Sequence, residues 1–185
     1  MVSSVLSSGK SSLGHKKGKS SGGKSSGGSG KKTASTAETT TNFTTICMTV
    51  FIFRGEPDFS YNRHVLMYFT SPDLPNFFET VHAQRQDDRS PWVVDQIHQE
   101  IDWALTRTYN THVNAGAVVV YPGQEMAPVN IFAAIRVGHR PGDWNCQHFL
   151  YEGMQELVNQ GFQQQEWCDM VTNETMDKVF EGSLG

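Results

Sequence analysis

The chain has 185 residues, enough for one ordinary domain, and its hydrophobic fraction of 37% lies below the usual globular share. Residues 1–45 hold seven lysines and one acidic residue, Glu38, and so carry a net charge of +6, which leaves −10 on residues 46–185. The three cysteines, Cys47, Cys146 and Cys168, exclude a closed disulfide framework. No apolar run is long enough to span a membrane. The sequence therefore predicts a basic tail joined to an acidic domain.

The predicted tail covers residues 1–44. Residues 1–45 contain twelve serines and eight glycines, and a Lys-Ser-Ser unit recurs at Lys10, Lys19 and Lys24. Such a composition buries too little apolar surface to offset chain entropy, so we expect disorder. A flexible extension is the favoured interpretation, and lysine contacts with acidic surfaces are the alternative. No aromatic residues interleave the lysines, so the case for nucleic acid is weak. The absence of a secretory signal favours an intracellular protein, cytoplasmic or nuclear.

The α+β domain is predicted over residues 45–185 and begins with strands. Residues 46–53 are apolar on both faces, which is typical of a central buried strand. Strands follow at residues 64–69 and 77–83, and the turn residues between them predict a hairpin. The class that we predict is α+β, an antiparallel sheet with packed helices.

The turn of this hairpin determines which residues face each other. With the turn centred on Asp73, His64 lies directly opposite His82, and Tyr68 faces Phe78 as an aromatic pair. Positions 64 and 82 are an even number of residues apart. The two histidines therefore share one face of a hairpin that has no bulge.

Helices and two more strands are expected after the hairpin. Ser90-Pro91 is a helix-start signal, and apolar spacing extends this helix to about Thr108, with Asp95, Glu100 and Asp102 on a solvated face. The remaining predicted elements are strands at 115–121 and 129–137, a loop at 138–142, a helix from 145 or 146 to 160 with Gly161 as its C-terminal cap, and a helical stretch at 164–180 broken near Thr172-Asn173.

The residues with chemical potential concentrate at Asn145-Cys146-Gln147-His148-Phe149. A cysteine in the first turn of a helix meets free backbone N–H groups and the positive end of the helix dipole, which favour the thiolate. A nucleophilic cysteine also needs an imidazole that takes and returns its proton, and His64 and His82 are the candidates. We assign no catalytic role to His148, and we interpret Cys47 and Cys168 as structural.

The order of these residues resembles the lecithin:retinol acyltransferase-like family, a circularly permuted branch of the papain-like (NlpC-type) thiol hydrolases. A similar signature occurs in PPPDE-type isopeptidases, and uncharacterised fungal proteins share the Asn-Cys-Gln helix start. The resemblance covers roughly residues 64–161. It implies a circularly permuted papain-like fold in which Cys146 is the nucleophile, His64 the base and His82 the residue that orients the base. The chain departs from the family at Gln147, where the family has glutamate, and at Val65, where it has an aromatic residue.

The resemblance implies a hydrolase or acyltransferase that acts on an amide, ester or isopeptide through a thioester intermediate. Its substrate would be a small molecule or a protein conjugate, and no cofactor is expected. We expect the Cys146 N–H, with Asn145 or Gln147, to hold the oxyanion. Tyr68 and Trp144 are expected to line the pocket.

Two alternatives remain at this stage. The first is a catalytically inactive papain-like module that binds a partner through the acidic domain or the basic tail. The second is a metal centre, because His139, Asp143, Cys146 and His148 are close in sequence. Their spacing does not match the usual paired zinc signatures, so we predict no metal ligands.

Overall fold

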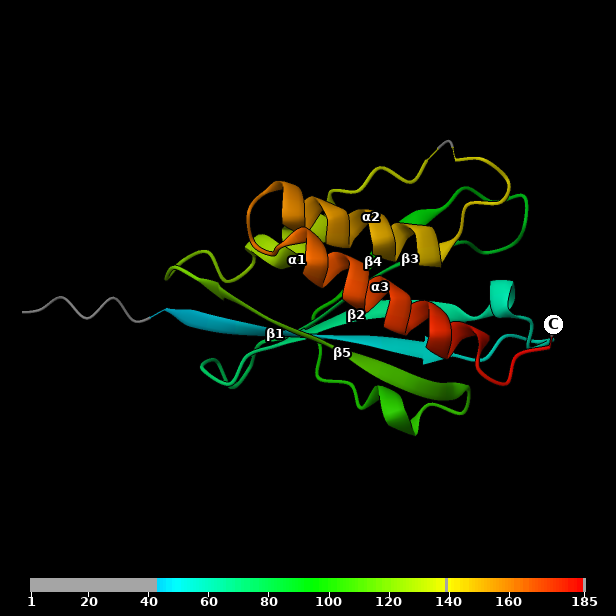
Figure 1. Ribbon diagram of the computed structural model, residues 1–185, viewed down its shortest axis with the longest axis horizontal. Helices are drawn as coiled ribbons and strands as arrows, with labels where there is room; N and C mark the ends of the chain where they lie inside the picture. Colours follow the sequence, from blue (N-terminus) through cyan, green and yellow to red (C-terminus); the bar gives the residue numbers. More distant parts are fainter. Residues whose placement is uncertain (1–42, 139, 185) are drawn as a thin grey trace, which may run out of the picture. The chain divides into compact units, whose positions relative to one another are not determined.

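The computed structural model describes residues 43–138 and 140–184, so the tail predicted over residues 1–44 lies, up to residue 42, outside the described residues. The described residues form an α+β domain with a five-stranded antiparallel sheet in the order β4-β3-β2-β1-β5 and three α-helices (Figure 1). The predicted class and the antiparallel sheet with packed helices are therefore confirmed.

Strand β1 (Thr44–Phe53) lies inside the sheet, between β2 (His64–Thr70) and β5 (Tyr109–Val120). On the far side of β2 follow β3 (Phe78–Gln84) and the edge strand β4 (Val93–Ile97). The four alternate residues of β1 that point to the helices are fully buried: Ile46, Met48, Val50 and Ile52. Strand β1 is therefore central in the sheet, as its apolar pattern predicts, but only the face toward the helices is fully buried, and alternate residues on the other face are partly exposed.

The helices α1 (Ala127–Ala133), α2 (Cys146–Asn159) and α3 (Gln165–Phe180) lie over one face of this sheet (Figure 1). Phe132 of α1 connects the layers, because its ring packs edge-on against Phe69 of β2 and Phe149 of α2. Two short 3₁₀ segments, η1 (Ser60–Asn62) and η2 (Trp103–Leu105), complete the described elements. The indole of Trp103 donates to Thr80 on the sheet face that points away from the helices.

Three predicted elements are wrong. Residues 90–108 do not form a helix but contain β4 and η2, because the β-branched pair Val93-Val94 joins the edge of β3. The strand expected at 129–137 is instead α1, with Pro128 in its first turn, where the missing N–H has no cost. Helix α3 continues through Thr172 and Asn173 without the predicted break.

Helix α2 and its cap match the sequence pattern closely. The helix runs from Cys146 to Asn159, and Gly161 adopts a positive φ of 78° just after the helix, as a C-terminal glycine cap requires. The strand expected at residues 115–121 forms the second half of β5, which begins earlier than predicted.

The hairpin β2–β3 forms, but its register differs from the predicted one by two residues. Thr70 pairs with Phe78 and Tyr68 pairs with Thr80, so His64 is not directly opposite His82. The loop contains a tight turn that Phe77 N–H closes on the carbonyl of Leu74, which moves the hairpin centre one residue along the chain. A shift of two residues keeps the same faces, so the two histidines still share one face.

The contact between α2 and α1 at Gly153 yields a stability prediction. A Cβ at this glycine would lie 2.3 Å from ring carbons of the buried Phe132. We expect Gly153→Ala to lower the free energy of unfolding by about 1–3 kcal/mol, because overpacking outweighs the gain in helix propensity. Urea unfolding measures this change, and Gly142→Ala, where the added Cβ meets open space, is the control. Equal stability of Gly153→Ala and the wild type would contradict the packing described.

Candidate active site

Helix α2 begins with a complete capping box. The side-chain oxygen of Asn145 accepts hydrogen bonds from the N–H groups of Gln147, at 2.9 Å, and His148, at 3.3 Å. In return, Nδ1 of His148 accepts from the Asn145 N–H at 3.3 Å. These bonds satisfy the first N–H groups of the helix and fix Cys146 as its first residue. His148 thus belongs to the cap.

The sulfur of Cys146 is buried against strand β2. The residue is 6% exposed, and Sγ lies 3.8 Å from the carbonyl oxygen of Arg63, to which the thiol donates. Burial raises the pKa of the thiol to about 11, although backbone N–H groups of Val65, Cys146 and Gln147 act in the opposite direction. Burial therefore outweighs the helix start, which by itself favours the thiolate, and the resting group is a neutral thiol.

The sulfur lies where strands β2 and β3 separate. Their pairing runs from Thr70 with Phe78 to Met67 with Val81, and in the described residues it does not continue to His64. A pocket of about 370 Å³ occupies this end of the hairpin. Its lining includes Asn145 and Cys146 from the start of α2, Arg63 and His64 from β2 and the residue before it, Gln84 and Arg85 from the end of β3, and Trp92. The predicted nucleophile and the predicted base therefore line the same pocket.

The two histidines contact each other on the face of the sheet that points away from the helices. Nε2 of His64 is 2.9 Å from Nδ1 of His82, although the residues are diagonal rather than opposite. Burial, and to a lesser extent the charge of His82, lowers the pKa of His64 to about 4. Burial also lowers the pKa of His82, against the opposing effect of Asp95. Both rings are therefore neutral at pH 7.

Asp95 is a neighbour of this histidine pair, although its sequence context predicts a position on the solvated face of a helix. Strand β4 instead sets Asp95 opposite His82, with Oδ2 of Asp95 3.5 Å from Nε2 of His82. The same carboxylate oxygen accepts from the side chain of Gln84 at 3.0 Å. The signal for this placement was the run Trp92-Val93-Val94, which has β-branched residues at the edge of a hairpin.

The hydrogen bond between the two imidazoles does not involve Nδ1 of His64. Nε2 of His64 is engaged with His82, so Nδ1 is the nitrogen with which His64 could accept a proton from a thiol. In the described part of the chain, Sγ of Cys146 forms no hydrogen bond with either imidazole, and its partner is the Arg63 carbonyl. The structure thus places Cys146 and His64 in one pocket without joining them by a hydrogen bond.

The side chains expected to hold an oxyanion have other partners. The Asn145 oxygen caps the helix, and Nε2 of Gln147 donates to the carbonyl oxygens of Ser60, at 2.8 Å, and Arg63, at 3.1 Å. The N–H of Cys146 belongs to the first helical residue, which has no acceptor within the helix. A backbone donor is therefore better placed than either side chain to hold an oxyanion.

The two aromatic residues expected in the pocket do not line it. Tyr68 lies further along β2 and lines a separate depression with Phe51 and His112. Trp144 is 5% exposed and donates through its indole N–H to Glu152. Its ring packs edge-on against Trp92, which together with Tyr61 borders the Cys146 pocket.

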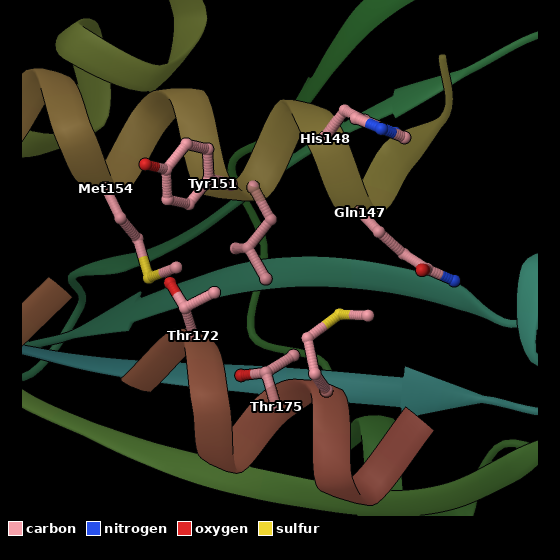
Figure 2. A pocket seen from close by; sticks show the side chains of 8 residues that line it. Gln147, His148, Tyr151, Met154, Thr172 and Thr175 are labelled. Carbon is pink, nitrogen blue, oxygen red and sulfur yellow. The ribbon is translucent and has the colours of Figure 1, made fainter. Parts of the chain in front are cut away.

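A more enclosed and more apolar cavity, of about 290 Å³, lies between α2 and α3. Figure 2 shows Met154, Tyr151, Thr172 and Thr175 around it, with Gln147 and His148 at one end. Neither Cys146 nor the histidine pair belongs to its lining. Chemistry needs reactive groups more than it needs enclosed volume, so we place the candidate active site at the Cys146 pocket.

Arg63 connects this site to the rest of the domain. Its side chain is buried and forms two hydrogen bonds with Asp58, at 2.9 and 2.8 Å. The remaining guanidinium nitrogen donates to the carbonyl oxygens of Lys178, Val179 and Glu181 at the end of α3, at 2.8 to 3.1 Å. Hydrogen bonding to Arg63 lowers the pKa of Asp58 below its ordinary value. The Arg63 side chain thus anchors the end of α3. Its backbone carbonyl oxygen accepts hydrogen bonds from the side chains of Cys146 and Gln147.

Comparison with family models, with curated proteins and with solved structures found no match for the chain. Among residues 43–138 and 140–184, no helix has the length and apolar character needed to cross a membrane. The described residues also contain no cluster of three His, Cys, Asp or Glu side chains that could hold a metal ion. His139, part of the metal alternative, lies outside them. Function must therefore be inferred from the geometry of the Cys146 pocket.

Removal of the Arg63 charge should destabilise the domain. We expect Arg63→Met to lower the free energy of unfolding by about 3–5 kcal/mol, because Asp58 and the end of α3 lose their buried partner. The control is Arg54→Met, since Arg54 is exposed and donates to Asn110, and its replacement should cost less than about 1 kcal/mol. Denaturant unfolding compares the two variants, with Arg63→Lys in reserve if the methionine variant does not fold. Similar costs for the Arg54 and Arg63 variants would contradict this role.

The buried neutral imidazole of His64 should make stability depend on pH. Above the ordinary pKa of 6.5 both folded and unfolded chains carry His64 neutral, so it adds no pH dependence. As the pH falls from 6.5 towards 4, the unfolded chain binds a proton that the folded chain excludes, and stability decreases. In His64→Gln the free energy of unfolding should fall less steeply with decreasing pH over that range, by up to about 1.4 kcal/mol per pH unit, the slope that one proton contributes, and urea unfolding at several pH values measures this slope. An unchanged slope in His64→Gln would mean that the folded ring binds protons freely.

Proposed function

We propose that the domain is a cysteine-dependent hydrolase or acyltransferase that acts on an amide, ester or isopeptide through a thioester on Cys146. The observation that carries this proposal is the pocket at the end of the β2–β3 hairpin, which Cys146 and His64 line together, with Nδ1 of His82 2.9 Å from Nε2 of the His64 ring. A nucleophile, a base and a residue that orients the base are the parts that such chemistry requires.

A circularly permuted papain-like fold is part of the same proposal. The strands that carry His64 and His82 precede the helix that begins with Cys146, and this helix packs against both strands. This order of elements agrees with the permuted branch that the sequence resembles. The capped start of α2 presents the cysteine to the hairpin, as a thiol hydrolase of this kind needs.

The proposed reaction requires Sγ of Cys146, on the helix side of β2, to leave the Arg63 carbonyl and to reach Nδ1 of His64, whose ring lies on the opposite face, at the end of the hairpin where both residues line the pocket. As the sulfur attacks the substrate carbonyl carbon, His64 accepts the thiol proton, and the Cys146 N–H donates to the developing oxyanion. Collapse of the tetrahedral intermediate breaks the bond to the leaving amine or alcohol, which receives the proton from His64. A water molecule or an acceptor nucleophile, deprotonated by the same ring, then attacks the thioester. The C–S bond breaks, the acyl group leaves on the nucleophile, and His64 returns the proton to the sulfur.

The lining of the pocket favours a polar substrate. Asn62, Gln84 and Arg85 supply amide and guanidinium groups at its border, and these can hydrogen bond with amide or ester substrates. The apolar cavity between α2 and α3, which could accept a hydrocarbon chain, is separate from Cys146. An amide, ester or isopeptide therefore fits this pocket better than a lipid acyl chain.

The second candidate function is a non-catalytic binding module on the same scaffold. It is favoured by the position of the Cys146 sulfur, which is buried and donates to the Arg63 carbonyl, with the pKa of the thiol raised to about 11. In such a module, Cys146 would serve to attach α2 to β2. The two candidates differ in whether Cys146 ever carries an acyl group.

Acylation by p-nitrophenyl acetate tests the enzymatic proposal. We expect one acetyl group on Cys146, located by peptide mass spectrometry and removed by hydroxylamine as a thioester would be. Cys146→Ser should lose this thioester, and His64→Gln should slow its formation by roughly 10²–10⁴-fold, because the general base is missing. Cys47→Ser is the matched control, and circular dichroism confirms that each variant folds. Acetylation confined to other residues, or an unchanged rate in His64→Gln, would support the binding module instead.

A further inference from the structure

We infer that Asp95 is a positioning residue that acts through His82 to set the tautomers of both imidazoles, so that Nδ1 of His64 is left unprotonated and able to act as a base. This inference rests on the proposed function and deepens it. It assigns a role to a carboxylate on β4 that the resemblance does not include.

The first support is the alignment of the three side chains. Residues His82 and Asp95 are direct partners in the β3–β4 ladder, so their side chains project from the same face of the sheet. Oδ2 of Asp95 is 3.5 Å from Nε2 of His82, whose Nδ1 is 2.9 Å from Nε2 of His64. The three groups form a chain that leads from the sheet edge to the pocket.

The contacts between Asp95, His82 and His64 also determine which ring nitrogens carry protons. The negative charge of a carboxylate favours an N–H over a lone pair beside it, so a neutral His82 carries its proton on Nε2, the nitrogen that faces Asp95. Nδ1 of His82 then has a lone pair, and Nε2 of His64 must donate to it. A neutral His64 protonated at Nε2 has its lone pair on Nδ1, which is the form that accepts a thiol proton. The reverse order would put a proton on Nδ1 of His64 and prevent it from acting as a base.

The third support is a buried ring nitrogen beside this carboxylate. Nε2 of His82 is buried, and its neighbour among the described residues is Oδ2 of Asp95, at 3.5 Å, a contact that lacks hydrogen-bond geometry. Oδ2 of Asp95 is held by the Gln84 side chain, which borders the pocket. When His64 accepts the thiol proton, the positive charge of the imidazole pair faces this carboxylate and is stabilised by it.

The test combines histidine NMR with acylation of the full-length protein. Asp95→Asn replaces the acceptor by an amide that can donate, Asp95→Glu restores the carboxylate, and Glu100→Gln, a nearby exposed acid, is the control. Long-range ¹H–¹⁵N spectra report which ring nitrogen carries the proton, and p-nitrophenyl acetate reports the acylation rate of Cys146 as a function of pH. Asp95, Cys146, Arg63 and Arg85 are the charged or titratable groups around the imidazole pair.

We expect both rings of the wild type and of Glu100→Gln to be protonated at Nε2. In Asp95→Asn a population protonated at Nδ1 should appear, with acylation slowed by about 10–100-fold, and Asp95→Glu should recover most of the rate. A wild-type His64 protonated at Nδ1, or tautomers and rates unchanged in Asp95→Asn, would overturn the role of Asp95. If the tautomers respond to Asp95→Asn while no variant acylates Cys146, the role of Asp95 stands and the proposed enzymatic function fails.

Discussion

The hydrogen bonds of Arg63 hold the parts of this domain in register. Its guanidinium is buried, which would be costly for an unpaired charge, but Asp58 and the last carbonyl oxygens of α3 satisfy it. Its own carbonyl oxygen accepts from the side chains of Gln147 and Cys146 at the start of α2. The position of α2 over β2, and with it the distance between Cys146 and His64, therefore depends on a residue that performs no chemistry.

The candidate site lies at the end of the β2–β3 hairpin where the pairing of the two strands ends. Strands β2 and β3 pair only as far as Met67 and Val81, so backbone groups beyond that point need other partners. The start of α2 satisfies one of them, because the Cys146 thiol and the Gln147 amide both donate to the carbonyl oxygen of Arg63. The same contacts bury the sulfur, so the feature that brings Cys146 to the histidine strand also keeps its thiol neutral.

The sequence predicted the elements whose signals are local and unopposed, such as the apolar strand β1 and the helix that begins after Asn145. It failed where two signals competed: Ser90-Pro91 indicates a helix start, but Val93-Val94 pairs with β3. The common face of His64 and His82 survived an error of two residues in the register because side chains in a strand alternate with a period of two. The contact between Asp95 and His82 could not be predicted, because it depends on the pairing of β4 with β3, and the sequence pattern at residues 90–108 predicts a helix.

The cost of proton transfer from Cys146 to His64 requires that neighbouring groups stabilise the imidazolium. With the pKa of the thiol about 11 and that of the imidazole about 4, proton transfer that leaves a thiolate and an imidazolium without mutual contact costs on the order of 10 kcal/mol. Turnover at 1 to 10³ per second allows a total barrier of only about 13–17 kcal/mol. A separate ion pair before attack would use most of that barrier. An active enzyme must therefore couple proton transfer to attack on the carbonyl and stabilise the imidazolium as it forms, and Asp95, placed behind His82, is the carboxylate that the fold provides for this purpose.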